Sequence, residues 1–272
     1  MRTLARRTST ALLALAAFLA LYALQLGYAD DLSKGVENVA FFLVPFAALF
    51  VLLRDVAWDA AALRTVVLVL VLEGLLFSLV AGAQYVTGEL FWNDKVIEGN
   101  EAHPYFRVNS LFWDPNILGR YIAVTMVVLA AVVAYGRDRR MLIGAVAAFL
   151  VLLVALIVTF SQSSTIALVG GVLVLVATRW GLAIGVGVGL ATLATLAASL
   201  ALIGGDGVSG ESSGRSSLVD GGIEIGEDAP LEGAGSGSFA IEFEDRFGAE
   251  EGFAVESHTE PVTVFAEQGA LG

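Results

Sequence analysis

Residues 63–84 form a long, predominantly apolar run, LRTVVLVLVLEGLLFSLVAGAQ. A transmembrane helix needs about 20 predominantly apolar residues, and this run has that length. The whole chain of 272 residues follows the same pattern: 57% are hydrophobic and only 15% are charged. A soluble domain is typically about half apolar and about a quarter charged. The apolar residues also come in long blocks, so the sequence predicts a polytopic membrane protein.

Six further apolar runs accompany residues 63–84. The predicted spans, in chain order, are residues 11–29, 36–53, 63–84, 116–135, 141–160, 165–177 and 181–203. A polar loop, 85–115, separates the third span from the fourth, and a long polar stretch, 204–272, follows the seventh. We therefore predict an all-α protein with a helical membrane bundle over 1–203. Residues 204–272 form a long extracytoplasmic loop in this prediction.

Charge predicts the orientation of the bundle. With the N-terminus in the cytoplasm, nine of the fifteen basic residues fall in cytoplasmic segments. The cytoplasmic loops that carry them are short. The positive-inside rule counts Lys and Arg in such loops, so it favours this topology. The net charge of −12 reflects acidic residues that lie mostly on the outer side. Cysteine is absent, which excludes disulfides and thiolate metal sites. Glycines at 181, 185, 187 and 189 predict close packing of the seventh helix.

Two sets of polar residues in or beside the membrane have open interpretations. Glu73 lies in mid-span, where a carboxylate marks either a site or proton path, or a neutral group bonded between helices. The outer loop reads Arg107-Val-Asn-Ser-Leu-Phe-Trp-Asp-Pro-Asn116. Asp114 and Pro115 are typical of a capped helix start. Alternatively, Arg107 and Arg120 flank an outward helix N-terminus, which suits a phosphate group.

The polar stretch 204–272 carries the remaining candidate residues. Ser212 or Ser213 is a possible cap for a short helix starting near Arg215. Residues 228–239 are rich in turns, but their glycines lack the spacing of a dinucleotide-binding loop. Residues 257–272 are typical of the start of an amphipathic or membrane-entering helix, with His258 near its outer end. An imidazole titrates near neutral pH, so His258 is a candidate base, although a single histidine is more often structural.

Together these motifs resemble the O-antigen ligase and polymerase family of bacterial surface-polysaccharide enzymes. Arg107 through Asn116 resembles that family's Arg-x-x-(small)-x-Phe-x-Asp/Asn-Pro-Asn motif. Arg215 with residues 229–239 resembles its large-loop Arg and Pro-Leu-x-Gly-x-Gly-x-x-Phe element. Ser257-His258 with residues 266–272 resembles its Ala-His-Asn…Ala-Glu-x-Gly-x-x-Gly close. The chain departs from the family at Ser164, where the family has Arg, and at Thr259, where it has Asn. It also ends where the family enters further membrane helices, so we expect a truncated or partial sequence.

The resemblance implies glycosyl transfer on the outer face of the bacterial cytoplasmic membrane. The donor is a glycan on undecaprenyl pyrophosphate, the acceptor is a hydroxyl of a glycan or glycolipid, and no metal, cofactor or nucleic acid takes part. His258 would be the base or acceptor-orienting group and Arg215 the main pyrophosphate contact, supported by Arg107 and Arg120. The alternatives are a polymerase of the same family, a transporter or exporter of lipid-linked glycans, for which broken helices and a repeat are expected, and a non-catalytic remnant.

Overall fold

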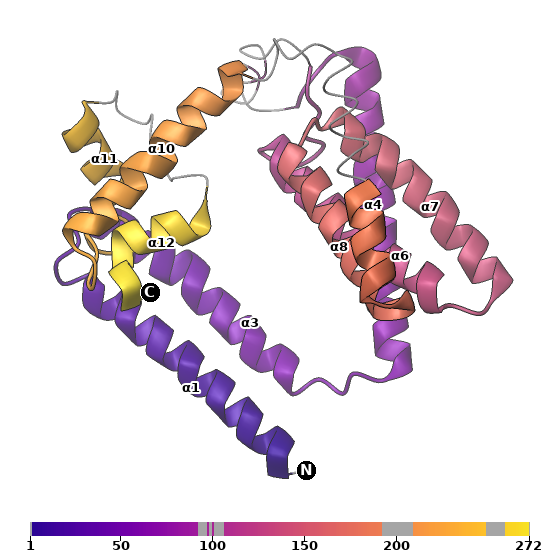
Figure 1. Cartoon of the computed structure of the whole chain (residues 1–272), viewed down its shortest axis with the longest axis horizontal. Helices are drawn as coiled ribbons and strands as arrows, with labels where there is room; N and C mark the ends of the chain where they lie inside the picture. Colours follow the sequence, from indigo (N-terminus) through magenta and orange to yellow (C-terminus); the bar gives the residue numbers. More distant parts are fainter. Residues whose placement is uncertain are drawn as a thin grey trace. The chain divides into compact units, whose positions relative to one another are not determined.

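The computed structural model describes residues 2–91, 97, 100, 106–191, 209–248 and 259–271, and for 2–9 and 209–216 the backbone alone. Regular structure in these residues is helical, without strands, as predicted. The helices follow in chain order, and Figure 1 labels the longer ones. They are α1 Arg2–Gln25, α2 Leu32–Asn38, the π-helix η1 Val39–Leu43, α3 Val44–Arg54, α4 Ala60–Thr87, α6 Pro115–Tyr135, α7 Arg139–Val158, α8 Gln162–Trp180, α10 Ser209–Asp228, α11 Phe239–Phe247, α12 Glu260–Gln268 and the 3-10 turn η3 Gly269–Leu271.

Five helical segments of the described chain are long and apolar enough to cross a membrane. They are Leu32–Arg54, Ala60–Thr87, Pro115–Tyr135, Arg139–Val158 and Gln162–Trp180. These coincide with the second to sixth predicted spans. At the first and seventh predicted spans, the apolar helices within the fully described residues are shorter, Thr10–Gln25 and Leu182–Ala191. The protein is thus a multi-pass membrane protein, and the number of seven spans stays a prediction.

The chain divides into two compact units, Met1–Val56 with Gly204–Gly272, and Ala57–Ile203. We call them the split unit and the bundle unit. The predicted division at residue 203 followed the change from apolar to polar sequence, and it stays a prediction. Contacts instead group the first helices with the polar stretch 204–272.

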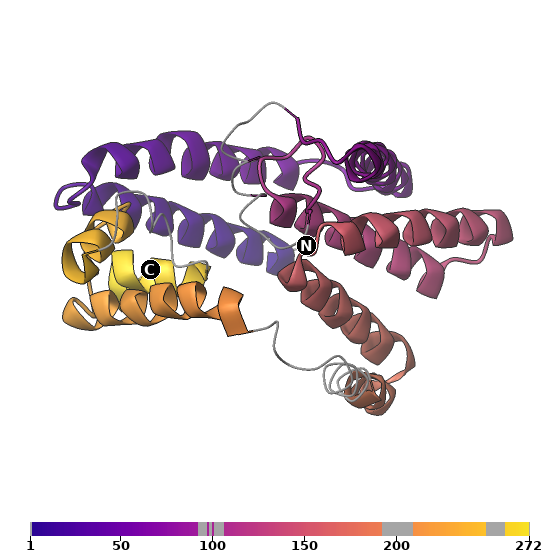
Figure 2. The ribbon, with the colours of Figure 1, turned by 90° about the horizontal axis from the view of Figure 1, so that it is seen from above.

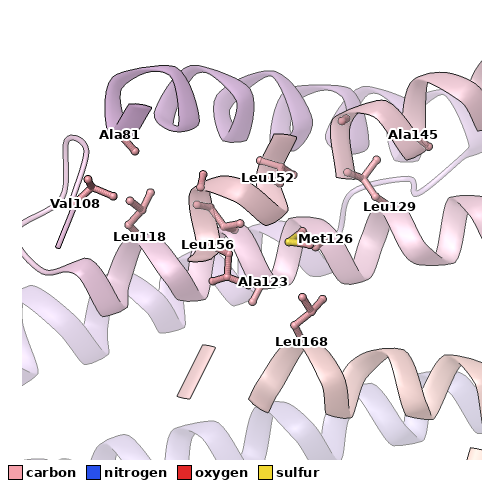
Figure 3. Close-up of a cluster of buried hydrophobic side chains, with 13 residues drawn as sticks. Ala81, Val108, Leu118, Ala123, Met126, Leu129, Ala145, Leu152, Leu156 and Leu168 are labelled. Carbon is pink, nitrogen blue, oxygen red and sulfur yellow. The ribbon is translucent and has the colours of Figure 1, made fainter. Parts of the chain in front are cut away.

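The bundle unit is built around α6. This helix packs against α4, α7 and α8, and its side chains Leu118, Ile122 and Met126 are fully buried. Figure 3 shows the cluster of apolar side chains between these helices.

Glycines let the helices of the bundle unit approach closely. A Cβ on Gly74 of α4 would lie 3.1 Å from Leu152 of α7, and one on Gly171 of α8 would lie 2.6 Å from Val127 of α6. Small residues are the usual means of packing helices where lipid is as apolar as the protein interior. The predicted packing role is confirmed for Gly185, where a Cβ would lie 2.6 Å from Ala177, and for Gly189, which approaches Leu173.

The split unit combines a helical hairpin with three outer helices. In it α1 packs against η1 and α3, as Figures 1 and 2 show. Helix α10 packs against α11 and α12 around Leu218, Ile225, Phe239, Phe243 and Ala266.

Pro45 shapes the second apolar segment locally. Proline lacks an N–H and its ring collides with the carbonyl four residues earlier, which breaks the α-helical ladder. The π-helix Val39–Leu43 lies directly before it, and the Val44 N–H bonds the Val39 carbonyl. A π-turn of this kind absorbs the disruption inside a continuous helix. Pro45 is thus accommodated within the second apolar segment.

The packing of α7 can be tested with two leucines that lie two residues apart. Leu152 is fully buried, whereas Leu150 is 56% exposed. Leu152→Ala should lower the free energy of unfolding by about 2 kcal/mol, because a cavity forms beside Gly74. Leu150→Ala should leave it nearly unchanged. Unfolding titrations in mixed micelles measure both, and equal effects would contradict the described packing.

Candidate functional site

Polar side chains gather at one end of the bundle unit. Helices α4 and α7 end there, α6 and α8 begin there, and the non-helical segment 106–114 runs between them. The Val108 N–H bonds the Val158 carbonyl at 3.3 Å, which joins this segment to the end of α7. The structure thus brings the Arg107–Asn116 motif together with the hydroxyl-rich segment 159–165.

Arg107 connects these two segments. Its Nε donates to the Thr159 carbonyl at 3.0 Å, and one terminal nitrogen donates to Asn116 Oδ1 at 3.1 Å. The side chain is buried, with 8% of its surface exposed. Its charge lies at the C-terminal end of α7, where the helix dipole favours a cation. These bonds give Arg107 a structural role, and the predicted phosphate contact stays a prediction.

Gln84 holds the non-helical backbone of the same segment. Its Oε1 accepts the N–H groups of Asn109 at 3.2 Å and Ser110 at 2.7 Å. Its Nε2 donates to Asn109 Oδ1 and to the Ser110 carbonyl, both at 3.1 Å. Ser110 has a positive φ of 54°, which is uncommon outside glycine. Three of these four bonds satisfy backbone groups of the turn inside the protein, and the fourth holds the Asn109 side chain.

Helix α6 begins as the capped helix that the loop motif predicts. Asp114 caps the helix by accepting the Asn116 N–H, and Pro115 occupies the first turn. Both predictions are confirmed. Arg120 lies one turn further and is exposed. An exposed guanidinium near a helix N-terminus is accessible to an anionic group.

The hydroxyls of segment 159–165 pack against α6. Ser161 Oγ and Ser164 Oγ lie 2.8 Å apart, and a Cβ on Gly119 would come within 2.7 Å of the Ser164 oxygen. Ser164 is fully buried. An arginine at this position has no room beside Gly119, which gives a physical reason for the departure noted in the sequence. Ser161 stands at the N-cap of α8 but makes no side-chain capping bond.

Glu73 bonds a tyrosine on the neighbouring helix. The Tyr121 hydroxyl donates to Glu73 Oε2 at 2.8 Å, and the carboxylate is exposed on the surface of α4. Tyr121 also stacks edge-on against Phe77. The bond between helices matches one of the two interpretations of Glu73, but the exposure does not place it in the interior of this bundle unit.

In the split unit, the glycine-rich segment 229–238 forms a close-packed turn. Gly233, Gly235 and Gly237 all have positive φ. A Cβ on Gly233 would lie 2.3 Å from the Gln268 backbone nitrogen, and one on Gly235 would lie 2.7 Å from the Ala29 Cα. The glycines therefore serve close backbone approach, and the predicted turn-rich character is confirmed.

Of the two residues with the main predicted chemical roles, the structure describes the backbone of Arg215 but not His258. Arg215 lies inside α10, Ser209–Asp228, so the predicted helix start near Arg215 is wrong. Ser212 and Ser213 are themselves helical, and neither is its cap. His258 lies outside the described residues, directly before the N-cap Thr259 of α12. Arg107 and Arg120 belong to the bundle unit and Arg215 to the split unit, and their meeting in one site stays a prediction.

Comparison with protein-family models, curated proteins and solved structures gave no match. Among the described residues, no group of three His, Asp or Glu side chains is arranged to hold a metal ion.

Glu267 is a residue that the sequence analysis quoted only as part of a motif. It is buried on α12, with 7% of its surface exposed. Burial raises its pKa, while the backbone N–H groups of Gly237 and Phe239 lower it to a smaller extent. Its neighbours Ala266 and Gln268 are also buried, and no periodic pattern in so short a segment signals this.

The role of Arg107 can be tested with a substitution that keeps the positive charge but removes the planar guanidinium and its several N–H donors. In Arg107→Lys, a single ammonium cannot reach both Thr159 and Asn116 with the same geometry. We expect the Val108 amide to exchange with solvent about tenfold faster, because a bond to a charged group contributes about 1.5 kcal/mol. Arg120→Lys, at the exposed position, is the matched control and should leave this rate unchanged. Equal rates in both variants would contradict the proposed connection.

Proposed function

We propose that this protein is an O-antigen ligase-like membrane glycosyltransferase. It would move a glycan from undecaprenyl pyrophosphate to an acceptor hydroxyl on the outer side of the cytoplasmic membrane. The proposal includes seven spans, a cytoplasmic N-terminus and an extracytoplasmic stretch 204–272. A polymerase of the same family uses the same donor and differs in its acceptor, so the same residues would serve either function.

The observation that carries the proposal is the order of the three polar motifs along an apolar helical chain. Positive charge at the ends of the spans supports the sidedness. The Arg107–Asn116 motif lies at the same end of the bundle unit as segment 159–165, as the resemblance implies for an outward site. Exposed Arg120 adds a cation at that end. Nucleotide sugars are not supplied outside the cytoplasm, so an outward site needs a donor that arrives in the membrane.

The reaction needs one base and one anion-stabilising group. His258 would accept the proton of the acceptor hydroxyl as its oxygen attacks the anomeric carbon of the donor. The bond between that carbon and the pyrophosphate oxygen breaks, and its electron pair leaves with undecaprenyl pyrophosphate. Arg215 would stabilise the departing charge through paired N–H donors, without a metal.

The test is polysaccharide transfer in cells that lack their own enzyme and express the full-length protein. His258→Ala should reduce transfer about 10²- to 10⁴-fold, as expected for loss of a general base. Arg215→Lys should reduce it about 10²-fold, because the charge remains but the paired donors do not. Arg246→Gln is the control, since Arg246 bonds Glu242 at 2.9 Å and Asp228 within the split unit.

Normal transfer by His258→Ala at normal protein levels would remove the proposal. Immunoblots of the membrane fraction establish those levels, so that loss of folding is not read as loss of catalysis.

A second candidate is transport of lipid-linked glycans, with Glu73 as the intramembrane carboxylate that would serve it. A carboxylate within a span is typical of ion and substrate pathways. Purified protein in liposomes separates the two functions. Transfer of the donor glycan to an added acceptor supports the glycosyltransferase, whereas movement of the donor across the bilayer without transfer supports the transporter.

A further inference from the structure

Glu267 contacts the glycine-rich segment 229–238 with both its backbone and its side chain. Its carbonyl accepts the Gly235 N–H at 2.8 Å, next to the bond from the Ala234 N–H to the Ala266 carbonyl at 2.9 Å. Its carboxylate accepts the Phe239 N–H at 3.4 Å and also bonds the Gly237 N–H. The end of α12 is therefore fixed to both flanks of the glycine-rich turn.

The same turn is fixed on its other side to the connection between α1 and α2. Ser236 Oγ donates to Gln25 Oε1 at 3.1 Å, and Gln25 Nε2 donates to the Glu232 carbonyl at 3.1 Å. The Asp30 N–H donates to Ser238 Oγ at 2.9 Å. The turn thus lies between α12 and the first hairpin, and Glu267 is the ionisable group in contact with it from α12.

Charge at this position is costly. Burial removes water from the carboxylate, and this is the main reason why its pKa is raised. Of the charged groups around it, Lys34 of α2 favours the ionised form and Glu260 of α12 opposes it. The phenol of Tyr22 on α1 also faces the carboxylate. The backbone N–H groups of Gly237 and Phe239 bond the ionised form but do not offset burial.

We propose that Glu267 is a proton-controlled latch, which holds the glycine-rich turn on α12 when protonated and loosens it when ionised. Loosening follows because an ionised carboxylate gains water when the junction opens. This device does not depend on the glycosyltransferase proposal, since it concerns the stability of one junction within the split unit.

The direction of the pH dependence follows from linkage. A carboxyl whose pKa is higher in the folded than in the unfolded state binds its proton more tightly when folded. Its contribution to stability is complete below the unfolded pKa and is lost as the pH rises through the folded pKa. Acidification from neutral pH should therefore tighten the junction, until other carboxylates protonate.

Hydrogen exchange of the Ala234 and Gly235 amides measures the latch, because both donate across the junction. The full chain in nanodiscs is measured between pH 4.5 and 8, and each rate is divided by the intrinsic exchange rate at that pH. In the unmodified protein, protection should fall as the pH rises. The fall should be about tenfold for each pH unit that separates the folded from the unfolded pKa.

Three variants separate charge from hydrogen bonding. Glu267→Gln keeps an acceptor oxygen without charge, so protection should be high and independent of pH. Glu267→Ala leaves the Phe239 N–H without its acceptor, so protection should be low at every pH. Glu260→Gln, at an exposed position of the same helix, should keep the fall, with its midpoint at lower pH. A pH dependence that persists in Glu267→Gln, or protection that rises with pH in the unmodified protein, would overturn the proposal.

Discussion

The amide of Gln84 is the interaction on which the polar end of the bundle unit depends. Backbone N–H and C=O groups that are buried away from water must be bonded within the protein. Helices meet this requirement by themselves, whereas the turn at Asn109 and Ser110 does not. Gln84 supplies four bonds to that turn, and Arg107 bonds the carbonyl of Thr159 beside it. The non-helical segment 106–114 can therefore lie among the helix ends, where Arg107 contacts Thr159.

The same requirement is met differently in the split unit. There the non-helical segment 229–238 bonds α12 through backbone groups and the α1–α2 connection through Ser236 and Ser238. Gly233, Gly235 and Gly237 allow the approach because a side chain at any of them would collide with a neighbouring backbone. The junction includes one buried carboxylate, Glu267, whose ionisation opposes its burial. Polar residues at both turns thus hold the backbone in place, and a chemical role for them must be compatible with these bonds.

The sequence allowed prediction of what depends on local pattern. Apolar runs of membrane length placed five spans, and Asp114 with Pro115 placed the start of α6, because capping involves neighbouring residues. The bonds of Gln84 and the burial of Glu267 could not be predicted, because each joins residues far apart in the chain and leaves no periodic signal. The start of α10 was misplaced because serines and glycines favour turns, whereas residues 209–214 are helical. The assignment of His258 and Arg215 came from motif order alone, and they stay predictions.

In the proposed topology, residues 204–272 face outward and the short basic turns face the cytoplasm. The chain has no cysteine, so single cysteines can be introduced without background. Thr259→Cys lies next to His258, and Ala61→Cys lies in the first turn of α4, and both positions are exposed. A membrane-impermeant maleimide on intact cells should label Thr259→Cys at once and Ala61→Cys only after permeabilisation. Labelling of Ala61→Cys but not Thr259→Cys on intact cells would contradict the account.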